Sequence, residues 1–183
     1  MSKIINCIDV ESTCDATIKC GYISEIIEIG ISTVNIETFE LKTYPSIFIK
    51  PEINGISDYC QNLTGITQSI INNGVTFKEA CTILRKRFAS KKRTFASWGN
   101  YDRSMFERMC EYNQYKDVPY PFNPNHLNIK ELFRIIYNLD KSVDMTKALE
   151  IANLYHVGRL HSGEMDAYNI SVIFLNILRK LRS

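Results

Sequence analysis

The first half of the chain alternates short apolar runs with turn-forming residues, which is typical of β-strands. Apolar runs rich in β-branched residues predict four strands, over residues 4–10, 25–34, 41–49 and 94–98. The connection near Asn35–Glu40 is short enough to join the second and third strands as an antiparallel hairpin. The first three strands are therefore expected to form a meander, and Pro51 ends the third of them.

Helical periodicity dominates the second half of the chain. Thr76 and Glu79 form a capping box at the start of a helix predicted over residues 76–90. One face of this helix holds Phe77, Ala80, Leu84 and Phe88. Further helices are predicted over residues 57–63, 101–112, 129–137, 146–155 and 162–181, and the apolar stripe of the last comprises Ala167, Ile170, Phe174, Ile177 and Leu181. Three prolines within residues 116–125 predict a loop.

This order of elements predicts an α/β fold, in which a mixed β-sheet is flanked by helices. A chain of 183 residues suits one domain over residues 1–183. No apolar run approaches the roughly 18 residues that cross a bilayer, and no signal-peptide pattern opens the chain, so we expect a cytoplasmic protein with no membrane partner. Reduced thiols are expected rather than disulfides or a zinc site, because no C-x-x-C pair occurs among Cys7, Cys14, Cys20, Cys60, Cys81 and Cys110.

Two carboxylates end the first predicted strand. Asp9 and Glu11 project from one face because side chains alternate along a strand. Carboxylates this close repel each other unless cations neutralise them, and hard divalent cations such as Mg²⁺ favour oxygen ligands. A solvated pair on an edge strand is the alternative interpretation. The flanking residues Ile8 and Val10 argue against it, because they indicate a buried strand where an unpaired acidic pair is costly.

Two later segments add acidic residues and a histidine. Asp102 stands at the start of a predicted helix, where it can serve as an N-cap, as a metal ligand, or as both. His161 precedes the last helix and Asp166 lies in its second turn. A histidine there can deprotonate a metal-bound water, although a loop histidine is more often a surface residue. The other two histidines, His126 and His156, are interpreted as structural or surface residues. Four carboxylates and one histidine suit a site that holds two divalent cations and activates water on a phosphodiester.

Four motifs occur in a fixed order, with D-V-E-S-T-C at residues 9–14, L-T-G-I-T at 63–67, W-G-N-Y-D at 98–102 and G-R-L-H-S-G-E-M-D-A at 158–167. Together they resemble the DEDDh family of 3′→5′ exonucleases, the DnaQ-like group with a ribonuclease-H-like fold. The resemblance is greatest to its Eri-type, KapD-like branch, in which alanine stands at the position of Ser12. It extends from Ile5 to about Asn176, which is nearly the whole chain.

The resemblance implies a role for each matching residue. The ligands of two metal ions, Mg²⁺ or Mn²⁺, would be Asp9, Glu11, Asp102 and Asp166, and the general base would be His161. The backbone at Ser12 and Thr13 would meet the 3′ hydroxyl of the terminal nucleotide, and Leu63 would wedge against its base. An apolar wedge accepts any base, so the enzyme is expected to tolerate any sequence.

The leading hypothesis is therefore a metal-dependent 3′→5′ exonuclease that releases 5′-mononucleotides from single-stranded 3′ ends, with RNA preferred. The alternatives are a DNA exonuclease of the same family and a catalytically silent nucleic-acid-binding module. A net charge of +2 gives no global signal for nucleic-acid binding. Arg159 is the better candidate for a phosphate contact, because the basic run Arg85–Arg93 also suits a solvated helix face. A partner protein could supply targeting, and the oligomeric state stays open.

Overall fold

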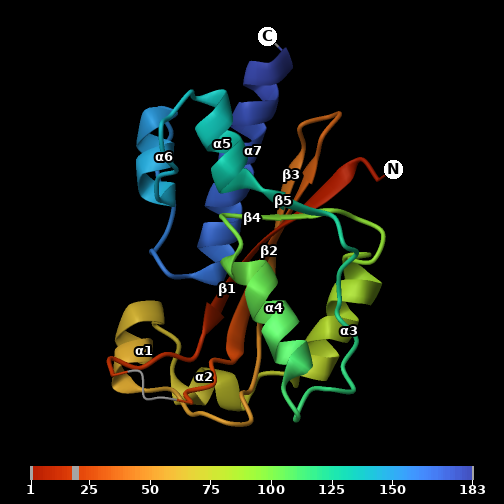
Figure 1. The fold of residues 1–183 in the computed structure, drawn as a ribbon, viewed down its shortest axis with the longest axis vertical. Helices are drawn as coiled ribbons and strands as arrows, with labels where there is room; N and C mark the ends of the chain where they lie inside the picture. Colours follow the sequence, from red (N-terminus) through yellow and green to blue (C-terminus); the bar gives the residue numbers. More distant parts are fainter. Residues whose placement is uncertain (1, 18–20, 183) are drawn as a thin grey trace.

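The computed structural model describes residues 2–17 and 21–182 and contains a five-stranded mixed sheet in the order β3-β2-β1-β4-β5 (Figure 1). The strands are β1 (Ile4–Ser12), β2 (Ile26–Asn35), β3 (Leu41–Phe48), β4 (Phe95–Ser97) and β5 (His126–Asn128). The first three strands pair antiparallel, whereas β4 pairs parallel with β1 and β5 parallel with β4. The predicted meander and the predicted mixed α/β sheet are confirmed.

Helices cover both faces of this sheet. They are α1 (Asp58–Thr64), α2 (Gln68–Asn72), α3 (Phe77–Arg87), α4 (Tyr101–Glu111), α5 (Ile129–Ile136), α6 (Met145–Ile151) and α7 (Gly163–Arg182). Figure 1 shows α3 and α4 away from the group of α5, α6 and α7, with α1 and α2 near the end of β1. Among the helices in the described ranges, none is both long enough and apolar enough to span a membrane.

The side chains of β1 separate the two layers. Ile8 and Val10 belong to the core that α3 and α4 form with one sheet face. Ile5 and Cys7 belong to the second core, which contains residues of α5, α6 and α7. Because side chains alternate along a strand, Asp9 and Glu11 continue the second series and project toward the α7 layer.

Four features differ from the prediction. The sequence does not predict the short helix α2 or the three-residue strand β5, which follows the proline-rich loop and exists through its pairing with β4. The helix predicted over residues 146–155 is α6 and already ends at Ile151. The prediction that Leu181 belongs to the packed apolar stripe of α7 is wrong, because its side chain is 57% exposed in the last turn. The other four stripe residues are buried as predicted.

The start of α7 packs directly on β2 through two glycines. A Cβ atom built on Gly30 would lie 1.7 Å from the carbonyl oxygen of Gly163, which no real contact allows. A Cβ atom on Gly163 would in turn meet the backbone nitrogen of Gly30 at 3.0 Å. Because glycine has no side chain, the helix can approach the strand backbone closely at these two residues. This approach fixes the height of the first turn of α7 above the sheet.

Replacing Gly30 by alanine should lower the free energy of unfolding by about 3 kcal/mol, at the upper end of typical overpacking costs. Urea denaturation followed by circular dichroism measures this change. The matched control is Gly55→Ala, because the nearest atom to a Cβ there is 3.4 Å away in a flexible glutamine side chain. Equal stability of the two variants would show that the glycine contact does not control the docking of α7.

Candidate active site

The first two carboxylates lie where β1 leaves the sheet. Asp9 and Glu11 pair with Gly30 and Glu28 of β2, and the register shifts between Glu11 and Ser12. Glu11 is 9% exposed. The irregularity ends the strand, so the two carboxylates stand at its carboxyl end facing the start of α7.

Asp102 reaches the same place from α4. The N-cap residue of this helix is Asn100, which makes no capping hydrogen bond with its side chain, so the N-cap interpretation of Asp102 is wrong. Instead, Oδ1 of Asp102 accepts a hydrogen bond of 2.9 Å from the backbone N–H of Val10. That N–H is available because, in the described part of the chain, β4 pairs with β1 only at Asn6 and Cys7. The buried carboxylate thus ties α4 to the unpaired edge of β1.

Asp166 lies one turn into α7, and its backbone N–H donates to Ser162 O at 2.8 Å. Its side chain is almost fully buried, and its Oδ1 atom has no hydrogen-bond partner. Nε2 of His156 lies 3.6 Å from this oxygen, too far for a hydrogen bond. The fold therefore places His156, interpreted from the sequence as a structural or surface residue, beside an acidic residue of the site.

These groups form one cluster at one cavity. Single carboxylate oxygens of Asp9, Glu11 and Asp166 all lie within 4.8 Å of one another. The cavity measures about 370 Å³. Its walls include seven residues predicted from sequence, namely Asp9, Glu11, Ser12, Leu63, Asp102, His161 and Asp166. His161 is exposed at this cavity and holds a left-handed backbone conformation with φ of 58°.

Burial and mutual repulsion disfavour negative charge on this cluster. Burial, followed by the neighbouring carboxylates, raises the pKa of Asp9 well above its usual range. The same causes raise the pKa of Glu11 to about 8. Burial also raises the pKa of Asp102 to about 6, although the hydrogen bond from Val10 offsets part of the effect. Burial also raises the pKa of Asp166, whereas the neighbouring His156 and His161 lower it in part.

The arrangement fits a divalent cation. Three oxygen donors converge, and one of them is a buried atom that no protein donor satisfies. Hard cations such as Mg²⁺ and Mn²⁺ prefer oxygen ligands of this kind. A bound cation would replace the missing donor at Asp166 and remove the repulsion that raises the carboxylate pKa values.

A further buried carboxylate, missed from the sequence, supports the cluster from β2. Glu28 is 3% exposed and accepts hydrogen bonds from the Ser46 hydroxyl and from the backbone N–H of Glu164. Among the charged groups, it is the largest contributor to the raised pKa of Glu11. The sequence signal that could have identified Glu28 is the presence of an acidic residue inside the otherwise apolar run E-I-I-E-I-G at residues 25–30. Five other residues of the cavity wall have no site role predicted from the sequence, namely Val10, Cys14, Trp98, Tyr101 and Met145.

Two residues expected to contact substrate, Thr13 and Arg159, are not among the residues that line the cavity. Thr13 is fully buried, its backbone N–H donates to Glu25 O at 2.8 Å, and its hydroxyl accepts from the Glu25 N–H. The backbone N–H of Thr13 is therefore already engaged, and the contact of Thr13 with a nucleotide stays a prediction. Arg159 donates from Nη2 to the carbonyl oxygens of Asn62 and Leu63 at 2.8 and 3.1 Å. It lies beside the cavity and holds the C-terminal end of α1, the helix that carries Leu63.

Ser12 and the remaining histidine have defined partners. The Ser12 hydroxyl bonds the Tyr101 hydroxyl at 2.7 Å at the cavity wall. Nε2 of His126 lies 2.9 Å from the Ser97 hydroxyl, and its ring packs on Phe95. Burial lowers the pKa of His126 to about 4, so the ring stays neutral and is consistent with the structural role expected for it.

The fold and this acidic cavity are typical of metal-dependent, carboxylate-rich nucleases. The chain belongs to the exonuclease family, because the family model described as Exonuclease matches residues 7–174. The resemblance to the Eri-type branch of DEDDh exonucleases is confirmed by the relatives described next.

Human 3′-5′ exoribonuclease 1 is 30% identical over 181 residues, which cover 94% of this chain and 51% of the relative. Bovine ERI1 exoribonuclease 3 is 26% identical, covering 95% of this chain and 52% of the relative. The chain thus spans about half the length of these curated relatives. The crystal structure of the nuclease domain of 3′hExo, a DEDDh family member bound to rAMP, matches with 28% identity and a TM-score of 0.85, covering 97% of this chain and 92% of that chain.

The raised pKa values predict how the metal-free protein responds to pH. A carboxyl that titrates higher when folded stabilises the fold below its unfolded pKa, and this contribution is lost as pH rises through the folded pKa. For Glu11 that window runs from 4.5 to about 8. In EDTA, the unfolding temperature should therefore fall between pH 5 and 8.5, and Glu11→Gln should flatten the fall. The control Glu111→Gln, at an exposed position of α4, should leave it unchanged. A pH profile in which Glu11→Gln matches the wild type would contradict this electrostatic picture.

Proposed function

We propose that this chain is a divalent-metal-dependent 3′→5′ exonuclease that releases 5′-mononucleotides from single-stranded RNA. The observation that carries the proposal is the buried, unpaired oxygen of Asp166 among the carboxylates of Asp9 and Glu11, beside an exposed His161. Relatives called exoribonucleases and a matching structure bound to rAMP support RNA as the substrate.

In this proposal Asp9, Glu11 and Asp166 hold two cations, Mg²⁺ or Mn²⁺, with Asp102 completing the set. When bound, the cations lower the pKa of a water and stabilise the charge that develops on the phosphate. Asp102 has a second task, because its hydrogen bond to Val10 fixes α4 against β1. The all-oxygen ligand set favours these hard cations over zinc, which selects nitrogen and sulfur ligands.

His161 is proposed as the general base that accepts the proton of the attacking water. It lines the cavity of the carboxylates from an exposed position, so a proton it takes up can pass to solvent. Its left-handed backbone conformation lies in a sparsely populated region for a non-glycine residue. The following residues, Ser162 and Gly163, lead directly into α7, so the helix start also fixes the place of the base.

The terminal nucleotide is proposed to occupy the cavity of about 370 Å³. Leu63 offers an apolar contact for its base, and Tyr101, which is 50% exposed, offers an aromatic face. The linked hydroxyls of Ser12 and Tyr101 lie at the wall where a 3′ hydroxyl could bond. Arg159 positions Leu63 through the two carbonyl oxygens it binds, and its other guanidinium nitrogens remain available for a phosphate.

The two alternatives differ in what they require. A DNA exonuclease would use the same cluster and would lack a contact to the 2′ hydroxyl that distinguishes RNA. A silent binding module is disfavoured because all four acidic positions and the histidine are filled and line one cavity.

We further propose that residues 1–183 act as one exonuclease domain in the cytoplasm, with targeting by a partner protein. Free thiols support a reducing compartment, and the described cysteines with free thiols are Cys7, Cys14, Cys60, Cys81 and Cys110. Cys20 lies outside the described residues.

Two variants should separate metal binding from proton transfer. Asp166→Asn should lose both Mn²⁺ binding, measured by isothermal titration calorimetry at pH 8, and nuclease activity. His161→Ala should bind Mn²⁺ like the wild type and lose about 10²–10⁴ in turnover, as expected when a general base is removed. Circular dichroism checks that both variants fold. Full wild-type activity in excess EDTA would refute the metal-dependent mechanism.

The polarity of cleavage tests the proposed function itself. A 5′-labelled single strand of RNA should shorten one nucleotide at a time from a free 3′ hydroxyl, and a 3′-phosphate should block the reaction by crowding the wall at Ser12 and Tyr101. A DNA strand of the same sequence, run in parallel on a denaturing gel, measures the sugar preference. Cleavage of a circular single strand would show an endonuclease, and faster loss of the DNA strand would favour the first alternative.

A further inference from the structure

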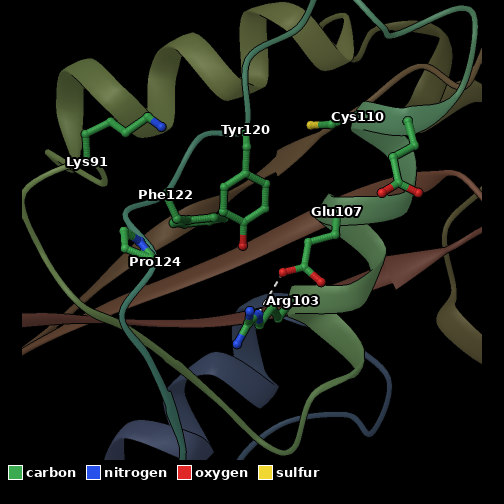
Figure 2. Close-up of a pocket in the computed structure, with 8 residues that line it drawn as sticks. Lys91, Arg103, Glu107, Cys110, Tyr120, Phe122 and Pro124 are labelled. Atoms are coloured by element: carbon green, nitrogen blue, oxygen red, sulfur yellow. Dashed lines mark hydrogen bonds and ion pairs between the residues drawn. The ribbon is translucent and has the colours of Figure 1, made fainter.

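A second and larger cavity, of about 510 Å³, lies along α4 and has no part in the proposed reaction. Figure 2 shows it between α4 and the segment that carries Tyr120, Phe122 and Pro124, with Lys91 on a third side. Consecutive residues of α4 line the two cavities, since Asp102 lines the catalytic cavity and Arg103 lines the second one.

Hydrogen bonds hold the irregular segment opposite α4, which carries Tyr120, Phe122 and Pro124, in place. The Ser90 hydroxyl donates to Pro121 O, and the Asn123 side chain donates to Arg93 O at 2.6 Å. The backbone N–H of Asn123 also donates to Ser90 O. Arg85 donates to Pro119 O from α3. A cavity bounded by segments tied together in this way is preformed, so a ligand would lose little free energy in ordering it.

The floor of the cavity is aromatic. Phe122 is 1% exposed and stacks on Phe95 with ring centroids 4.2 Å apart. Tyr120 meets Phe122 edge to face at 5.7 Å, and its half-buried ring faces the cavity in Figure 2. Phe122 is buried, so the half-buried ring of Tyr120, which Phe122 supports, is the surface on which a planar ligand would stack.

The cavity lies beside the basic run at residues 85–93, which the catalytic site does not use. Lys91 from this run lines the cavity, and its side chain points toward Tyr120 in Figure 2. Within residues 2–17 and 21–182, no ion pair engages Lys86, Lys91 or Lys92. By contrast, Arg103 is paired with Glu107 at 2.8 Å. Among the described residues that line the cavity, Lys91 is therefore the cation without an ion pair.

We propose that this cavity is a second binding site for the substrate strand, which takes a base upstream of the 3′ end. The proposal rests on the proposed function and extends it. Aromatic floors with lysines beside them bind single strands of any sequence, because every base has a face that stacks. Glu107 and Glu111 repel a phosphate from the floor and can accept hydrogen bonds from the edge of a base. The backbone phosphate is therefore expected at Lys91.

The distance to the catalytic cavity suits this assignment. The eleven residues of α4 extend about 16 Å. A strand whose last nucleotide lies at Asp102 can therefore reach Tyr120 within a few nucleotides, passing the first turn of the helix. A dinucleotide is too short to occupy both sites, so strand length separates their contributions.

The test compares wild-type protein with Lys91→Glu and Tyr120→Ala on RNA strands of two and of about twelve nucleotides. Each variant should raise KM for the longer strand about tenfold, with kcat unchanged and the cleavage of the dinucleotide unaffected. Tyr120→Phe should restore binding, because a phenyl ring still stacks. Lys141→Glu removes an exposed lysine in the connection between α5 and α6 and should change nothing.

An unchanged KM for the longer strand in Lys91→Glu and Tyr120→Ala would overturn the proposal and leave the cavity to a protein partner. An equal loss on the dinucleotide would also overturn it, because the effect would then arise in the catalytic cavity. Fluorescence anisotropy of the longer strand in EDTA separates this proposal from the proposed function. Binding that depends on Lys91 without cleavage in Mg²⁺ would sustain the second site and reject the nuclease.

Discussion

The catalytic end of this molecule depends on how closely α7 approaches β2. Gly30 and Gly163 meet backbone to backbone, and this contact sets the position of the first turn of the helix. Asp166 lies in that part of the helix, so the same contact determines how near its carboxylate comes to Asp9 and Glu11 on the neighbouring strand. Glu28 accepts the N–H of Glu164 and thereby satisfies one of the free donors at the helix start.

This close approach brings several carboxylates together in a buried place, where burial already disfavours their charged form. The pKa values of all four carboxylates at the cavity shift upward, with burial as the first cause in each case. Asp102 gains a hydrogen bond from the backbone N–H of Val10 that favours its charged form, and that bond also anchors α4. The metal-free site therefore opposes the charge state that its proposed cations require. Such local conflict is expected where a fold serves function rather than its own stability.

The sequence predicted those parts that depend on local pattern. The strands, the capped helix α3 and the grouping of the acidic segments follow from apolar runs, capping residues and motif order. What it missed depends on tertiary contacts. The strand β5 needs β4 beside it, and the bulge after Glu11 turns Thr13 toward Glu25 rather than toward the cavity. His156 lies 3.6 Å from Asp166, next to the place where the Asn169 amide binds the backbone of Val157 through both its oxygen and its nitrogen.

The shortness of β4 links these observations. Its recorded pairing with β1 stops at Cys7, so the edge of β1 beyond that point is free to receive Asp102. The chain turns into α4 directly after β4, and successive residues of this helix line the catalytic cavity and the second cavity. In the proposed function the strand must advance by one nucleotide after each cleavage. A stacking platform that accepts any base permits this movement, because each new base meets the same ring surface without a change of register. One helix start could therefore hold the reacting end and guide the strand that follows it.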